Sequence, residues 1–194
     1  MSVNQYGNGV REDPRVTRTR ELIEQSFHEL LREKRLHALT IGDIAERARI
    51  NRATFYAHFE DKYHLYRHTV QSTYAQILQA NLSVTGDDKQ GQLRALIAAT
   101  CTFFEQLNST CPPVDRQSRP LVEVEVQRQV YDFVLGWLRA HVAIEAIQPA
   151  TPEVCARMVG WAIWGAALDW EESQQPMDRL VEQIFSVVAK MAPR

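Results

Sequence analysis

The sequence contains little cysteine, glycine and proline, and each shortage excludes a class of protein. Its 194 residues include three cysteines, none of which has the CxxC spacing. An odd number of cysteines without that spacing supports neither a disulfide scaffold nor a zinc site, and it favours a reducing cytoplasm. Its 8 glycines and 8 prolines fall below the average usage of about 12% for the two together, which favours helices.

Long apolar runs are also missing. The most apolar uncharged run, Met158 to Leu168, has 11 residues, whereas a helix needs roughly 20 to cross a bilayer. The first ten residues have neither the basic start nor the apolar stretch of a signal peptide. We therefore expect a cytoplasmic protein without a membrane partner.

Motifs for catalysis are absent, and the charge is nearly balanced. The sequence has no GxSxG, P-loop, HExxH or Rossmann fingerprint, so we predict no enzyme and no cofactor. A net charge of −2 argues against a polycation that binds nucleic acid by bulk charge. Residues 11–70 nevertheless carry a net charge of +2, while residues 71–194 carry −4. This asymmetry favours nucleic-acid contact in the first segment.

Apolar residues recur at helical spacing along most of the chain, and no stretch alternates like a strand. Asp13 before Pro14 predicts a capped first helix, and Thr40 with Asp43 predicts a capped second one. We predict an all-α chain with a disordered tail at 1–12, a DNA-binding domain at 13–62 and an effector-binding and dimerisation domain at 63–194. The expected helices are 14–34, 40–48, 52–59, a long one from about 60, 91–108, 120–146, 152–173 and 176–191, with a linker at 83–90 and a loop at 110–120.

Two short helices joined by a three-residue break, after a longer helix, form a candidate helix-turn-helix. Phe55 and Phe59 lie four residues apart in the second short helix, so we expect both to be buried. Several polar side chains would then face solvent or DNA: Arg52, Thr54, Tyr56 and His58. Arginine suits guanine, threonine suits a base or a phosphate, and tyrosine and histidine reach phosphates. Lys62, at the start of the next helix, favours a phosphate. An ordinary solvated face is the alternative for this set.

The stretch TIGDIAERARINRATFYAHFEDKYHL resembles the DNA-binding domain of TetR/AcrR-type transcriptional repressors. The matching features are the apolar-T-x-x-x-I-A opening, the Thr54-Phe55-Tyr56-x-His58-Phe59 core, and Lys62 followed by Leu65. The resemblance covers about residues 15–65. It implies operator contacts at Thr40, Arg52, Thr54, Tyr56, His58 and Lys62. Two positions depart from the family pattern: Ala53 replaces a residue that is often glycine, and Tyr63 replaces a common acidic residue.

Other polar clusters have simpler interpretations. His64 and His68 have the spacing of metal ligands on a helix, but the sequence shows no third ligand, so we predict no metal site. Glu123, Glu125 and Asp132 suit either a cationic ligand or a solvated helix face.

Aromatic residues gather in the second domain, where they line an effector pocket or fill the core. The candidate effector contacts are Phe103, Phe104, Trp137, His141 and Trp161. Such a lining favours flat, largely apolar molecules that a few polar groups orient.

The last two helices are apolar over more than one face, which indicates that one face packs on the body of this chain and another is buried by a partner. We therefore predict a two-fold homodimer through helices 152–173 and 176–191, as the resemblance also implies. The candidate interface residues are Trp164, Leu168, Val181, Ile184 and Val188.

These observations predict a dimeric, ligand-responsive transcriptional regulator, most simply a repressor. It would bind a palindromic operator in double-stranded DNA and be released by a small-molecule effector. Two alternatives stay open: a helix-turn-helix DNA binder without an effector, and a small helical enzyme or scaffold with an incidental helix-turn-helix.

Overall fold

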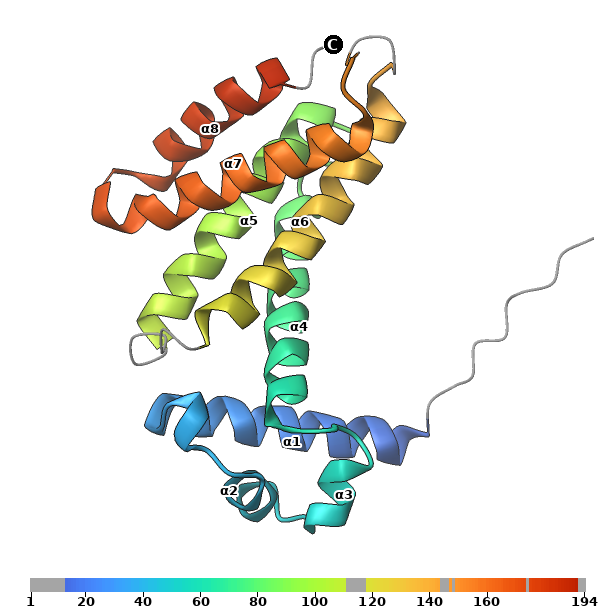
Figure 1. Ribbon diagram of the computed structural model, residues 1–194, viewed down its shortest axis with the longest axis vertical. Coiled ribbons are helices and arrows are strands. Elements are labelled where there is room, and N and C mark those ends of the chain that lie inside the picture. Colours follow the sequence, from blue (N-terminus) through green and yellow to red (C-terminus); the bar gives the residue numbers. More distant parts are fainter. Residues whose placement is uncertain (1–12, 111–117, 144–146, 148, 174, 192–194) are drawn as a thin grey trace, which may run out of the picture. The chain divides into compact units, whose positions relative to one another are not determined.

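The computed structural model describes residues 13–110, 118–143, 147, 149–173 and 175–191 (Figure 1). These residues form helices and no strand, which confirms the predicted all-α class. The chain divides into two compact units, residues 1–62 and 63–194, whose described parts we call the head and the body. The predicted tail at 1–12 lies outside the described residues. The elements are α1 (Pro14–Glu33), the 3-10 turn η1 (Leu36–Ala38), α2 (Ile41–Arg47), α3 (Arg52–Tyr56), α4 (Lys62–Leu82), α5 (Lys89–Thr110), α6 (Arg119–His141), α7 (Pro152–Ser173) and α8 (Met177–Met191).

The head is built on the amphipathic helix α1. Asp13 caps its start, since Oδ1 of Asp13 accepts the backbone N–H of Arg15 at 2.9 Å, and Pro14 follows in the first turn. The inward face of α1 buries Ile23 and Phe27 completely. Helix α2 packs against α1 and α3 packs against α2, so the two short helices have a common apolar support.

The observed helices differ from the predicted ones at a few ends. Helix α3 ends at Tyr56 rather than at residue 59, although the backbone N–H of Phe59 still donates to Phe55 O at 2.9 Å. The turn η1 was not predicted, because three residues give no periodic signal. Helix α6 ends at His141, where the extended Val142 donates its N–H to Leu138 O. Residues 111–117 of the predicted loop lie outside the described residues.

The body is a bundle in which α6 packs along α7, and α5 contacts both α7 and α8 (Figure 1). One face of α6 is buried at every fourth residue: Val122, Val126, Val130, Val134 and Leu138. Helix α4 joins this core through Tyr74, whose hydroxyl lies 2.9 Å from Thr100 Oγ1 on α5. None of the described helices combines the length and apolar character that crossing a membrane would need.

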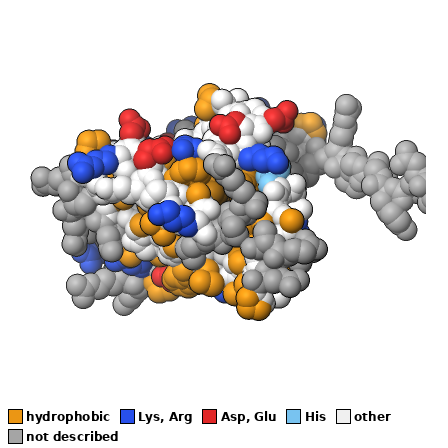
Figure 2. All heavy atoms as spheres, turned by 90° about the horizontal axis from the view of Figure 1, so that it is seen from above, with side chains coloured by type: hydrophobic (Ala, Val, Ile, Leu, Met, Phe, Trp, Pro, Cys, Tyr) orange, Lys and Arg blue, Asp and Glu red, His pale blue; other side chains and the backbone are white. Residues whose placement is uncertain are grey.

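Hydrophobic side chains also reach the surface of the molecule among charged ones (Figure 2). Arg94 shows how the two kinds combine in the body. Its Nε donates to Glu182 Oε1 at 2.6 Å, and its guanidinium lies 3.6 Å from the ring centroid of Phe185. Arg94 therefore joins α5 to α8 by charge and by stacking.

Candidate nucleic-acid interface and body surface

Helix α2 begins with a capping box. Oγ1 of Thr40 accepts the backbone N–H of Asp43 at 3.1 Å, and Asp43 Oδ2 accepts the backbone N–H of Thr40 at 2.9 Å. The pKa of Asp43 is held below its usual range, first by that backbone hydrogen bond and then by the Thr40 hydroxyl. The start of α2 is therefore defined by two residues of its own first turn.

Helix α2 ends in a tight turn around Arg49. The backbone N–H of Arg49 donates to Glu46 O at 3.1 Å, and that of Ile50 donates to Ala45 O at 2.9 Å. These two bonds define a Schellman motif, whose turn residue is most often glycine because it adopts a left-handed conformation. Arg49 has this conformation, with a φ of 55°. The helix-turn-helix break therefore carries backbone strain in this chain.

Helix α3 is held by its cap and by two buried rings. Oδ1 of Asn51 accepts the backbone N–H of Thr54 at 2.7 Å and the Thr54 hydroxyl at 3.0 Å. Phe55 and Phe59 are buried, with ring centroids 5.9 Å apart. The opposite side carries Arg52 and Tyr56, and Tyr56 is 56% exposed. Burial on one side thus presents polar side chains on the other.

The structure brings the six predicted DNA contacts into the head, with different exposures. Thr40, Arg52 and Tyr56 are exposed, whereas Thr54 and His58 are half-buried. The hydroxyl of Thr54 is already bonded to the Asn51 cap, so a contact with DNA would compete with the cap or share it.

Lys62 has a structural role that the sequence did not reveal. Its Nζ donates to the backbone carbonyls of His37 at 2.9 Å and Leu39 at 2.7 Å. These carbonyls flank the end of η1, so the ammonium group closes the connection between α1 and α2. A phosphate contact by Lys62 would have to form beside these two bonds.

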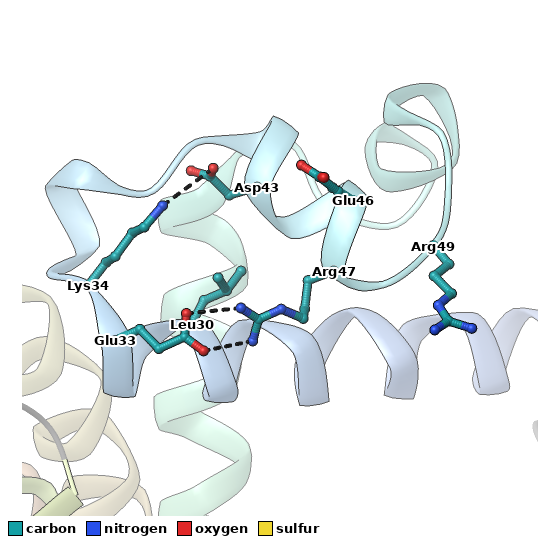
Figure 3. A pocket seen from close by; sticks show the side chains of 7 residues that line it. All are labelled: Leu30, Glu33, Lys34, Asp43, Glu46, Arg47 and Arg49. Carbon is teal, nitrogen blue, oxygen red and sulfur yellow. Dashed lines mark hydrogen bonds and ion pairs between the residues drawn. The ribbon is translucent and has the colours of Figure 1, made fainter.

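Ion pairs join α1 to α2 around a hollow of about 430 Å³ (Figure 3). Arg47 donates to both carboxylate oxygens of Glu33, at 3.0 and 2.9 Å, and to Glu29 at 3.4 Å. Lys34 lies 3.6 Å from Asp43. The hydrogen bond from Arg47 lowers the pKa of Glu33. Because these charges pair with each other across the two helices, we interpret the hollow as a joint rather than a ligand site.

Metal binding finds no support in the part of the chain that the structure describes, where no three His, Cys, Asp or Glu side chains gather to hold an ion. His64 and His68 are half-buried and interact with other residues. Burial raises the pKa of the Cys101 thiol to about 12, so it stays protonated and is a poor ligand or nucleophile.

The five predicted effector contacts fall into three separate groups. Phe103 and Phe104 are buried, Phe103 against Tyr74 and Phe104 against Trp164, with centroids 5.6 and 4.7 Å apart. Trp137 and His141 meet edge to face near the end of α6, and Trp137 Nε1 donates to Lys89 O at 3.0 Å. Trp161 lies on the surface of α7 and is 51% exposed. The structure thus separates these five residues into three groups, and their contact with an effector stays a prediction.

Trp161 lines a groove of about 440 Å³ between α6 and α7. The guanidinium of Arg157 lies 4.7 Å from the ring centroid of Tyr131 inside it. The remaining lining residues are Glu123, Val124, Gln127, Arg128 and Asp132. The groove therefore offers aromatic faces, one cation stacked on a ring, and carboxylates.

Four of the five predicted interface residues lie in the body's own core. Trp164, Val181, Ile184 and Val188 are between 0% and 8% exposed. Side chains so enclosed leave almost no surface for a partner, and their part in a dimer contact stays a prediction. Leu168 is half-buried and keeps some surface.

The exposed apolar stripe of the body lies on α7 instead. Val154, Met158 and Trp161 are 49%, 53% and 51% exposed, and half-buried Gly165 and Leu168 continue the line. These five residues, which we call the α7 seam, are spaced by four, three, four and three, the repeat of helices that pack against another helix. The spacing is visible in the sequence, but the similar spacing on α8 competed with it.

Comparison with known proteins agrees with this geometry. Residues 28–69 match the family model for bacterial regulatory proteins of the tetR family. An uncharacterised HTH-type transcriptional regulator of Bacillus subtilis, YxbF, is 33% identical over 98 residues. This match covers 50% of the chain but only 26% of YxbF, so the chain spans about a quarter of that relative.

Solved structures share the fold over nearly the whole chain. NalD, the secondary repressor of the MexAB-OprM multidrug efflux pump in Pseudomonas aeruginosa, is 18% identical, with a TM-score of 0.61 over 92% of this chain and 98% of NalD. A TetR-family regulator of Streptomyces coelicolor is 17% identical, with a TM-score of 0.59 over 95% and 99% of the two chains. FadR of Bacillus subtilis, solved with stearoyl-CoA, is 14% identical, with a TM-score of 0.57 over 87% and 96%.

The family model and the curated relative both describe transcriptional regulators, which agrees with the prediction that the chain is not an enzyme. The family match covers the helix-turn-helix, and the structural likeness extends the same fold through the body. Residues 28–69 are therefore similar to the tetR family of bacterial regulatory proteins, and the whole chain shares the fold of solved TetR-family regulators.

Proposed function

We propose that the chain is a homodimeric transcriptional repressor that binds a pseudo-palindromic operator in the cytoplasm. The observation that carries this proposal is helix α3, whose buried Phe55 and Phe59 leave Arg52 and Tyr56 exposed on a capped helix. A recognition helix of a helix-turn-helix needs this arrangement, because its outward side chains enter the major groove. NalD, which shares the fold, is a repressor.

The exposed residues suit different parts of the operator. Arg52 has the fork geometry that reads guanine or grips a phosphate, while Tyr56 and His58 reach phosphates. Thr40, exposed at the start of α2, suits a backbone contact. Phosphate contacts would set the register, and base contacts would set the sequence preference.

Selection from random DNA, followed by binding titrations at several salt concentrations, tests this proposal. We expect a two-fold symmetric site with half-sites about 34–36 Å apart or a multiple of that spacing. The log–log salt slope should be about −0.9 per phosphate contact. Tyr56→Phe should weaken binding to all sequences alike, since phosphate contacts do not specify sequence. Binding without any symmetric preference would refute the proposal.

We assign the dimer contact to the α7 seam. Its exposed apolar side chains lose unfavourable contact with water when a second copy covers them. Val187 on α8, which is 55% exposed, adds a further exposed apolar side chain to the body. A dimer links two heads, and linkage raises operator affinity far above that of one head.

Two substitutions separate this assignment from simple loss of folding. Met158→Glu places a charge on an exposed position, so we expect a folded monomer with much weaker operator binding. Ile184→Glu places a charge in the core, where the side chain is 6% exposed, so we expect unfolding. Sedimentation equilibrium and circular dichroism distinguish the two results. A Met158→Glu variant that stays dimeric would refute the seam.

We further propose that a small-molecule effector releases the operator by binding in the groove between α6 and α7. Trp161 belongs both to this groove and to the α7 seam. A molecule bound in the groove would therefore disturb the contact between two copies of the chain. Tyr131 and Trp161 favour flat molecules, and Glu123 and Asp132 favour a positive group. An effector in this groove should quench tryptophan emission and release DNA over the same concentration range.

A second candidate function keeps DNA binding but has no effector. It is favoured by the chain of buried rings from Tyr74 through Phe103 and Phe104 to Trp164, which agrees with the alternative that the aromatic residues fill the core. A thermal-shift screen decides between the two candidates. Hits that release operator DNA, and that lose this effect in Tyr131→Ala, which changes the groove outside the α7 seam, support the effector. Hits without DNA release support the second candidate.

A further inference from the structure

Gly42 and Arg52 lie against each other across the helix-turn-helix. Gly42 is in the first turn of α2, and Arg52 is the first residue of α3. A Cβ atom built on Gly42 would lie 2.8 Å from Nη2 and 3.5 Å from Cζ of Arg52. The guanidinium therefore occupies the space that any other residue at position 42 would fill with its side chain.

Arg52 has no ion pair or hydrogen bond that would hold it there among the described residues. Asp43, the carboxylate next to Gly42 in the sequence, already accepts hydrogen bonds from Thr40 and pairs with Lys34. The missing side chain of Gly42 is thus what allows the position of Arg52. Thr40 Oγ1 lies on the same side, 3.4 Å from the built Cβ atom.

We propose that Gly42 is a positioning residue for Arg52. Because position 42 has no side chain, the guanidinium lies against α2 in the geometry that meets DNA. This inference rests on the proposed function. A guanidinium reads a base or a phosphate through a planar fork, and such contacts tolerate displacements of only about 0.5 Å. A methyl group at position 42 pushes the guanidinium outward, because the approach of 2.8 Å is shorter than real Cβ contacts allow.

The substitution Gly42→Ala separates positioning from folding. Alanine favours helices over glycine, and the crowded atom is the tip of a flexible side chain, so the variant should melt no lower than the wild type. Gly136→Ala on α6 is the matched control, because a Cβ atom there meets nothing within 4 Å. Of these two variants, we expect only Gly42→Ala to change operator binding.

A double-mutant cycle on the selected operator tests the coupling. Arg52→Ala should lower the affinity about 5- to 150-fold, the effect of losing one bidentate contact. Gly42→Ala should lower it by at least about threefold in the wild type and by less than about twofold in Arg52→Ala. In random-site selection, Gly42→Ala should alter the preference only at positions that Arg52→Ala also alters. A merely structural role would not move that pattern.

The outcomes separate this inference from the proposed function. Equal losses from Gly42→Ala in both backgrounds, or no loss in the wild type, would overturn the role of Gly42 while operator binding stands. Wild-type protein that binds no symmetric site would overturn the proposed function itself. An unchanged operator affinity in Arg52→Ala would remove Arg52 from the interface, and Gly42 with it.

Discussion

Replacing Arg49 by glycine should stabilise the head, because Arg49 holds the left-handed position of the turn between α2 and α3. Its φ is 55°, and its N–H and that of Ile50 close the Schellman motif. The side chain is exposed and lies at the rim of the hollow in Figure 3, apart from the ion pairs drawn there. Removing it therefore costs little contact.

The magnitude follows from two opposing effects. A left-handed conformation costs a residue with a Cβ atom about 1–2 kcal/mol, and glycine avoids this cost. Glycine also gives the unfolded chain more freedom, which destabilises by about 0.5–1 kcal/mol. The middle of these ranges leaves a net gain of about 0.7 kcal/mol. For a chain of this size, that gain raises the melting temperature by about 1–3 °C.

Arg49→Ala is the control, because it removes the same charge but keeps the Cβ atom. Its stability should stay within about 0.5 kcal/mol of the wild type. All four tryptophans lie in the body, so the measurement should use calorimetry and circular dichroism, which report on the head as well. If the glycine and alanine variants melt at the same temperature, the turn stores no left-handed strain and the reasoning is wrong.

Three further predictions concern the cap of α3, the core of the body and the ion pairs of the head. Asn51→Ala should lower the stability of the head by about 1 kcal/mol in calorimetry, while Asn51→Ser keeps most of it, since only the second variant can accept the Thr54 N–H. Tyr74→Phe should cost about 0.5–1.5 kcal/mol in urea denaturation followed by tryptophan fluorescence, because Tyr74 loses its buried bond to Thr100; an unchanged midpoint would contradict that bond. The pKa values of Asp43 and Glu33 are lowered from 3.8 and 4.5, so their stabilisation is complete above those values and is lost as the pH falls through the lower folded values. Melting temperatures of the head should therefore drop below about pH 4, and Asp43→Asn should flatten this drop.

Local signals in the sequence are sufficient for most of the head. Asp13 and Thr40 were predicted to cap the first two helices, and the structure has both caps. Capping works within one turn of a helix, so the residues that decide it are neighbours in the sequence. The burial of Phe55 and Phe59 also followed from their spacing, because a helix places residues four apart on one face.

Interactions between residues far apart in the sequence were not predicted. The bonds of Lys62 to the carbonyls of His37 and Leu39 join positions more than twenty residues apart. The contact of Gly42 with Arg52 depends on how α2 crosses α3. No periodicity encodes such contacts, since they arise only when the helices pack.

The amino-acid sequence by itself determined that this chain is helical, where the helix-turn-helix lies and which face of α3 is apolar, because these depend on residues within a few positions of each other. Only the tertiary structure decided which apolar helix face packs within the chain and which stays at the surface. Val181, Ile184 and Val188 have the period of an interface, yet α8 packs them against its own chain, while Met158 and Trp161 on α7 stay at the surface. Periodicity shows that a face must be buried. Whether the chain itself or a second copy buries that face depends on the packing of every other helix.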